Sequence, residues 1–137
     1  MMDRKSEKGF SLIELIVVMV ILTLLAAIVG PRLFKYVTSS KPKAATVQIR
    51  ELEGVLDLYA LDMGHYPDTS QGLEALIRNP GKSEAWNGPY LKREQLPKDP
   101  WGRPYVYRCP GMHGEYDLFS VGPDGVDGGD DDIVSWK

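Results

Sequence analysis

The sequence is poor in the residues that most often carry out chemistry. Its 137 residues include one cysteine, Cys109, and two histidines. A single cysteine rules out a disulfide within the chain. No serine, cysteine or histidine stands in a pattern typical of a catalytic site, so we expect neither an enzyme nor a small-molecule substrate. The 16 basic residues form no patch and are outnumbered by 19 acidic ones, so nucleic-acid binding is not expected either.

Basic residues are also absent from the apolar run Phe10–Val29. A helix of about 20 residues covers about 30 Å, the thickness of a bilayer core. The alternative is a secretory signal peptide, but the run continues past its only weak cleavage site, Leu25-Ala26-Ala27. We therefore predict a transmembrane helix over residues 10–30. Its N-terminus should face the cytoplasm, because the nearest basic residues, Arg4, Lys5 and Lys8, precede it.

One carboxylate, Glu14, lies inside this apolar run. A bare charge at membrane depth costs a few kcal/mol even on lenient insertion scales, so such a residue marks a candidate functional site. No cation in the span can pair with it. Cleavage after Gly9 would give Phe10 a free α-amino group, which could pair with Glu14 of the same chain or of a neighbour.

The stretch Gly9-Phe10-Ser11-Leu12-Ile13-Glu14 resembles the processing site of type IV pilins and type II secretion pseudopilins. The resemblance implies that a prepilin peptidase cleaves between Gly9 and Phe10 and methylates Phe10. It also implies that Glu14 is needed for assembly. Residues 1–9 would then be a leader peptide.

Two prolines follow the span. At Gly30-Pro31 we expect a kink or a local loss of helix, since proline lacks the N–H donor and clashes with the preceding turn. Pro42 predicts a bend or break, with Ser39 or Ser40 able to cap a fresh start.

Residues 31–64 are predicted to form an amphipathic helix in the periplasm. Apolar residues recur there at helical spacing and form one stripe that should face a core: Ala45, Ile49, Leu52, Leu56 and Tyr59. Gly64 is a suitable stop for this helix.

Residues 65–137 are predicted to form a small globular domain. A short helix is expected over residues 71–78, and residues 105–108 and 116–121 should pair as an antiparallel hairpin. A third short strand is expected over residues 133–136. The fold class is therefore α+β, with the long helix lying across a small sheet. So small a core without a disulfide needs a metal or oligomerisation to stabilise it.

An acidic loop over residues 121–133 carries five aspartates, and no lysine or arginine lies between Arg108 and Lys137 to balance them. Two charges about 4 Å apart repel by roughly 4 kcal/mol at an effective dielectric near 20, so a compact loop needs a cation. Oxygen ligands without histidine or cysteine favour Ca²⁺ over Zn²⁺. An EF-hand is excluded, because its glycine and glutamate are missing. The alternative is a disordered, solvated loop.

Five further motifs resemble one family, the major pseudopilins of the type II secretion system, known as general secretion pathway protein G. They are Leu61–Pro67, Gln71–Leu76, Trp86–Leu91, Pro97–Tyr105 and Tyr116–Gly125. The resemblance implies a type IV pilin-like fold and one Ca²⁺ bound by the aspartates of the loop, together with the backbone carbonyls of Val121 and Val126. The implied aspartate ligands are Asp124, Asp130, Asp131 and Asp132.

The resemblance also implies a function. The chain would be an inner-membrane subunit that polymerises into a periplasmic filament, the pseudopilus, and drives export of folded proteins across the outer membrane. Implied partners are further copies of the chain, minor pseudopilins, the inner-membrane secretion platform, the prepilin peptidase and membrane lipid. Two alternatives stay open: a type IV pilin of a surface fibre, and a monomeric, membrane-anchored Ca²⁺-binding module.

Overall fold

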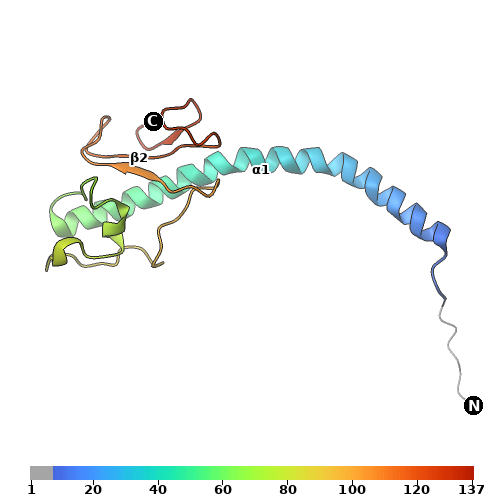
Figure 1. Ribbon diagram of the computed structural model, residues 1–137, viewed down its shortest axis with the longest axis horizontal. Coiled ribbons are helices and arrows are strands. Elements are labelled where there is room, and N and C mark those ends of the chain that lie inside the picture. The colour runs from blue at the N-terminus through green and yellow to red at the C-terminus, as the bar shows by residue number, and fades with distance from the viewer. Residues whose placement is uncertain (1–7) are drawn as a thin grey trace, which may run out of the picture. The chain divides into compact units, whose positions relative to one another are not determined.

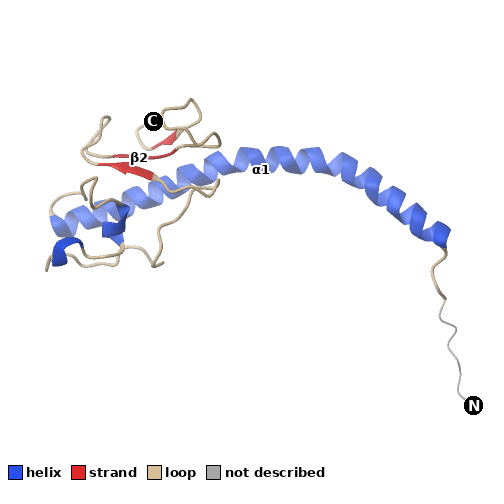
Figure 2. Cartoon of the chain, in the orientation of Figure 1, coloured by secondary structure: helices blue, strands red, loops and turns tan. Residues whose placement is uncertain are grey.

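The computed structural model describes residues 8–137, which fall into two compact units divided after Thr38. Helix α1, Leu12–Met63, contributes residues to both units (Figures 1 and 2). The second unit adds two short 3₁₀ helices, η1 (Leu73–Leu76) and η2 (Pro80–Lys82). It also contains three strands, β1 (Val106–Arg108), β2 (Asp117–Ser120) and β3 (Ile133–Val134).

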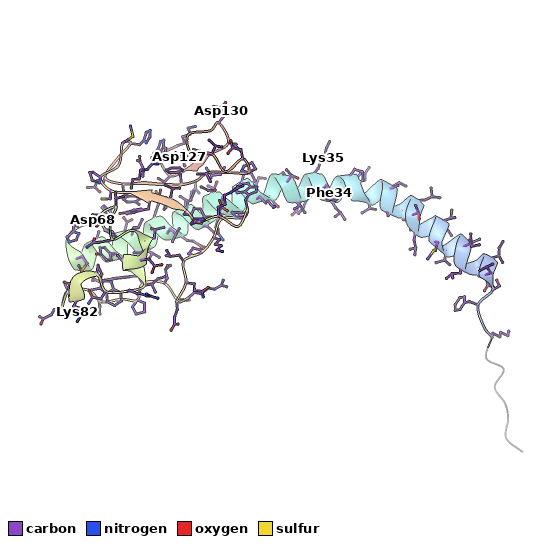
Figure 3. The ribbon with its side chains drawn as sticks, viewed as in Figure 1. Phe34, Lys35, Asp68, Lys82, Asp127 and Asp130 are labelled. Carbon is purple, nitrogen blue, oxygen red and sulfur yellow. The ribbon has the colours of Figure 1, made fainter. Side chains whose placement is uncertain are left out.

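Apart from residues 8–11, the described part of the first unit is α-helix, and its side chains point outward. None of the described residues 8–38 is buried, and apolar side chains such as Leu12 and Phe34 are 78% and 76% exposed. Phe34 and Lys35 project freely from α1 in Figure 3. Within residues 8–137, α1 is the one helix long and apolar enough to cross a membrane. An apolar surface this large requires lipid or other protein chains around it.

Neither proline interrupts α1. Residues 30–31 and 39–43 are all helical, so the predicted local loss of helix at Pro31 and the fresh start at Ser39 or Ser40 are wrong. Each proline removes one hydrogen bond, whereas ending a helix and starting another leaves about four orphan groups at each new end. Near Pro42, the Thr46 hydroxyl donates to the Pro42 carbonyl at 3.0 Å.

The C-terminal part of α1 supplies the core of the second unit. Its five buried residues are those of the predicted stripe: Ala45, Ile49, Leu52, Leu56 and Tyr59. Four of them, all but Ala45, cluster with η1 and with residues of the sheet such as Tyr107 and Leu118. The helix ends where predicted, because Gly64 has a φ of 81° and donates to the Ala60 carbonyl at 2.8 Å.

The sheet is antiparallel in the order β1-β2-β3 (Figure 1), and Leu118 of β2 belongs to the same buried cluster as residues of α1. Val106 pairs with Phe119, and Phe119 pairs with Val134 on the other side. The predicted hairpin and third strand are therefore confirmed. The helix expected over residues 71–78 is reduced to η1, because Gly72 before it has a φ of 60° and Pro80 follows shortly after it.

Candidate functional site

The acidic loop spans residues 121–132 and is closed by the sheet. It leaves β2 after Ser120 and returns at β3, where Ile133 pairs with Ser120. The two ends of the loop are therefore neighbours on one ladder. Gly122, Gly125 and Gly128 have φ values of 68°, 72° and 86°, which let the chain turn back tightly.

Three aspartates of this loop come together. Asp124, Asp131 and Asp132 each offer one carboxylate oxygen, and these oxygens lie within 4.8 Å of one another. Each of the three residues uses an oxygen to hold the loop backbone. Asp124 accepts from the Val126 N–H at 2.9 Å, Asp131 from the Asp124 N–H at 3.2 Å, and Asp132 from the Gly128 N–H at 2.9 Å.

The remaining oxygens fit a metal ion. Within residues 8–137, Asp132 Oδ1 is buried and has no hydrogen-bond partner. A Cβ placed on Gly129 would lie 2.9 Å from Asp131 Oδ1, 3.0 Å from Asp124 Oδ2 and 3.4 Å from the Val126 carbonyl. Oxygens from three residues thus lie close to Gly129. A hard cation bound to oxygen at about 2.3–2.6 Å bridges ligands up to about 5 Å apart, which suits this group.

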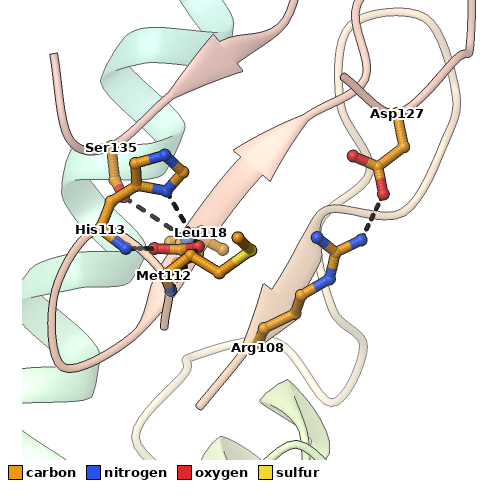
Figure 4. A network of polar contacts seen from close by, with 7 residues as sticks. Arg108, Met112, His113, Leu118, Asp127 and Ser135 are labelled. Carbon is orange, nitrogen blue, oxygen red and sulfur yellow. Dashed lines mark hydrogen bonds and ion pairs between the residues drawn. The ribbon is translucent and has the colours of Figure 1, made fainter. Parts of the chain in front are cut away.

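The other predicted ligands are placed less closely. Asp130 is exposed, lies at the outside of the loop in Figure 3, and does not belong to the group of three. Val121 is buried at the start of the loop, and the role of its carbonyl stays a prediction. Asp127, also in the loop, forms an ion pair with Arg108 of β1 (Figure 4).

Two arginines outside the loop reach it, which the sequence did not reveal. Arg108 pairs with Asp127, and both side chains are nearly half exposed, so the pair contributes at most about 1 kcal/mol. Arg103 donates from one guanidinium nitrogen to the Gly122 carbonyl at 2.7 Å and to the Pro123 carbonyl at 3.4 Å. These two arginines supply positive charge near the loop, so the loop depends less on a bound cation than its own composition indicates.

A buried carboxylate holds the connection between β1 and β2 (Figure 4). Asp117 of β2 is 1% exposed and accepts from the Met112 N–H, the His113 N–H and the His113 ring. The His113 ring in turn stacks on Trp136 with ring centroids 4.0 Å apart. Burial alone would raise the pKa of Asp117, but the hydrogen bonds from Met112 and His113 outweigh it and hold the pKa below 3.8.

At the N-terminus, Glu14 is paired within its own helix. The Ser11 N–H donates to Glu14 Oε2 at 3.1 Å, and the Glu14 N–H donates to the Ser11 hydroxyl at 3.3 Å. This is a capping box, and the spacing Ser11-x-x-Glu14 could have predicted it from the sequence. The Glu14 carboxylate therefore lies at the first turn of α1. Gly9 and Phe10 precede the helix and are exposed, Phe10 by 87%.

The predicted leader, residues 1–9, lies mostly outside the described residues. Only Lys8 and Gly9 of it are described, and both are exposed. Cleavage after Gly9 and methylation of Phe10 therefore stay predictions.

Comparisons with known proteins give the family. The model of the family "Type II secretion system (T2SS), protein G" matches residues 32–136, and that of the "Prokaryotic N-terminal methylation motif" matches residues 4–30. The type II secretion system core protein G of Pseudomonas aeruginosa is 45% identical over 142 residues, 98% of this chain and 99% of the relative. That of Vibrio cholerae is 44% identical over 143 residues, 100% of this chain and 97% of the relative.

A solved structure is also similar. The crystal structure of the major pseudopilin from the type 2 secretion system of enterohaemorrhagic Escherichia coli superposes with a TM-score of 0.62 at 39% identity. The match covers 72% of this chain and 88% of that one.

A long N-terminal helix that begins in an apolar segment, packs farther on against a small antiparallel sheet and carries a methylation motif defines a type IV pilin-like protein. Within that class, the chain belongs to the protein G family of the type II secretion system, the major pseudopilins.

The lowered pKa of Asp117 predicts a loss of stability in acid. A carboxylate whose pKa is lower in the folded than in the unfolded state stabilises the fold above the unfolded pKa, and this contribution is lost as the pH falls below about 3.8. Asp117→Asn should cost about 1–3 kcal/mol near neutral pH and flatten the stability profile below about pH 4. Urea unfolding of the detergent-solubilised chain measures both effects. The exposed Glu74→Gln is the control, and an equal acid slope in Asp117→Asn and the unaltered chain would contradict this role.

Proposed function

We propose that this chain is the structural subunit that polymerises into the periplasmic pseudopilus of a type II secretion system. The function is mechanical rather than catalytic: growth of the filament drives export of folded proteins across the outer membrane. The proposal rests mainly on the exposed apolar surface of the first unit. Its described residues bury nothing, yet they hold a long apolar surface and one carboxylate. Such a surface is suited first to lipid and then to the helices of neighbouring copies.

Glu14 gives this assembly its register. In the membrane, the capping box with Ser11 satisfies part of the carboxylate's hydrogen-bonding capacity, although it supplies no opposite charge. Processing after Gly9 frees the α-amino group of Phe10, and in the filament this amine of one subunit meets Glu14 of another. A subunit docked out of register leaves both charges unpaired in an apolar environment, which is strongly unfavourable.

The chain is then a single-pass protein of the bacterial inner membrane. Its N-terminus lies in the cytoplasm and its second unit in the periplasm, from where it moves into the filament. The prepilin peptidase, the minor pseudopilins and the inner-membrane platform are its partners in this scheme.

Calcium is the proposed ligand of the acidic loop. Asp124, Asp131 and Asp132 would hold it, with the Val126 carbonyl close by, and Asp130 and the Val121 carbonyl complete the predicted set. The bound ion supplies positive charge that offsets repulsion among the aspartates. The loop backbone is already fixed by their other oxygens, so the ligands need little rearrangement.

Loss of the Glu14 carboxylate should prevent assembly and leave insertion intact. Glu14→Ala leaves the neighbour's amine without a charged partner, which costs about 3–5 kcal/mol. The equilibrium constant for assembly then falls by on the order of 100-fold or more. Filaments released from the periplasm by spheroplasting and membrane fractions, quantified by immunoblot, measure the two steps. Thr23→Ala is the matched control, since Thr23 lies in the same apolar segment and its hydroxyl donates to the Met19 carbonyl within α1. Wild-type levels of filament from Glu14→Ala would identify a monomeric anchored protein instead.

Removing calcium should destabilise the second unit. A ligand at about 100 times its dissociation constant adds about 2.7 kcal/mol, which raises the melting temperature of a unit this size by on the order of 10 °C. Melting of the full chain in detergent, in EDTA and then in excess Ca²⁺, measures the shift. Asp132→Asn should abolish it, whereas Asp127→Asn should retain it because Asp127 lies outside the group of three. The same melt in EDTA and Ca²⁺ would contradict the site, and an effect of Asp127→Asn equal to that of Asp132→Asn would contradict the ligand set.

A further inference from the structure

Arg103 contacts the backbone of the acidic loop rather than its aspartates. Its guanidinium donates to the carbonyls of Gly122 and Pro123, at 2.7 and 3.4 Å. It also packs against Gly125, where an added Cβ would lie 2.7 Å from Arg103 Cζ. Among residues 8–137, no aspartate forms an ion pair with Arg103. The guanidinium therefore binds the first turn of the loop, residues 122–125, by its shape and donors.

The segment that carries Arg103 is itself held tightly. Asp99, which is 4% exposed, donates its backbone N–H to the Arg103 carbonyl at 2.7 Å. Its carboxylate accepts from the N–H groups of Arg103 and Trp101, at 2.8 and 3.1 Å. This Asp99–Arg103 turn leaves the backbone of Arg103 little freedom.

The same buried carboxylate also fixes the start of the loop. Ser120, which is fully buried, donates its hydroxyl to the second oxygen of Asp99 at 2.6 Å. The Ser120 hydroxyl oxygen in turn accepts from the Gly122 N–H at 3.2 Å. Gly122 is thus held by its N–H through Ser120 and by its carbonyl through Arg103, and both connections lead to Asp99.

We propose that Arg103 is a positioning residue for the metal loop. Anchored by Asp99, it holds the turn of residues 122–125 so that Asp124 meets Asp131 and Asp132 before any ion binds. The inference rests on the calcium part of the proposed function and names the device that prepares that site. Groups that hold metal ligands in place typically change metal affinity by about 10–100-fold when they are removed.

The alternative role of Arg103, balancing negative charge, predicts the opposite sign. A nearby positive charge repels Ca²⁺, so its removal would tighten binding, and the effect would weaken in high salt. Positioning predicts that removal loosens binding and that salt changes this loss little. Lysine separates the two further, because it keeps the charge but lacks the planar set of donors.

The test is Ca²⁺ titration of the full-length chain in detergent, by calorimetry, at low and high salt. Arg103→Gln should weaken binding about tenfold, and Arg103→Lys should restore part of that loss. Arg108→Gln is the matched control. It also removes an arginine that reaches the loop from outside, but Arg108 pairs with a side chain that is not in the group of three. The control should change the affinity less than about twofold. Unchanged or tighter binding by Arg103→Gln would overturn the proposal.

Hydrogen exchange in EDTA tests the same proposal without calcium. In Arg103→Gln, exchange should become faster at residues 122–128 and stay unchanged in β1, β2 and the helical core. Faster exchange throughout the second unit would show that Arg103 supports the fold in general, and no change at all would show that it anchors nothing; both overturn the proposal. If the unaltered chain binds no Ca²⁺, the proposed calcium site is disproved. The exchange measurement then still decides whether Arg103 positions the loop.

Discussion

A carboxylate in an apolar helix needs a cation or a hydrogen-bond donor, and this constraint links most features of the N-terminal unit. Among the described residues 8–137, Glu14 accepts only from the Ser11 N–H, a neutral donor. The described part of the unit buries no residue, so it cannot satisfy its apolar surface alone. The proposed assembly supplies both needs, since neighbouring helices cover the apolar surface and a neighbour's processed N-terminus supplies the positive charge. Processing, which frees the amine, and polymerisation, which pairs that amine with Glu14, are then linked through this residue.

The features with a regular sequence pattern could be predicted. The stripe from Ala45 to Tyr59 is buried as expected, because one face of a helix must repeat every three to four residues. The three strands were found from their aromatic and β-branched residues. The predicted interruption of the helix at the prolines was wrong, because the local cost of Pro31 and Pro42 is smaller than the cost of ending a long helix twice. The capping box also has a regular pattern, Ser11-x-x-Glu14, and could be predicted from that spacing.

The acidic loop could be located from the sequence, but its architecture could not. The count of aspartates identified a candidate metal site, and the structure groups Asp124, Asp131 and Asp132. Which aspartates converge depends on the register of β2 with β3, and the composition of the loop does not give that register. The arginines that contact the loop come from the Asp99–Arg103 turn and from β1, so no local pattern could reveal them. A loop dense in one charge is thus held by groups distant in sequence.

The measurement that bears most directly on the proposed assembly is an intact mass spectrum of the full-length protein extracted from the membranes of cells that contain the secretion machinery. Pairing between subunits requires a free amine at Phe10, so the mass should correspond to a chain that starts at Phe10 and carries one methyl group. A chain that still starts at Met1 in the assembled fraction would leave Glu14 without a charged partner and would contradict the account.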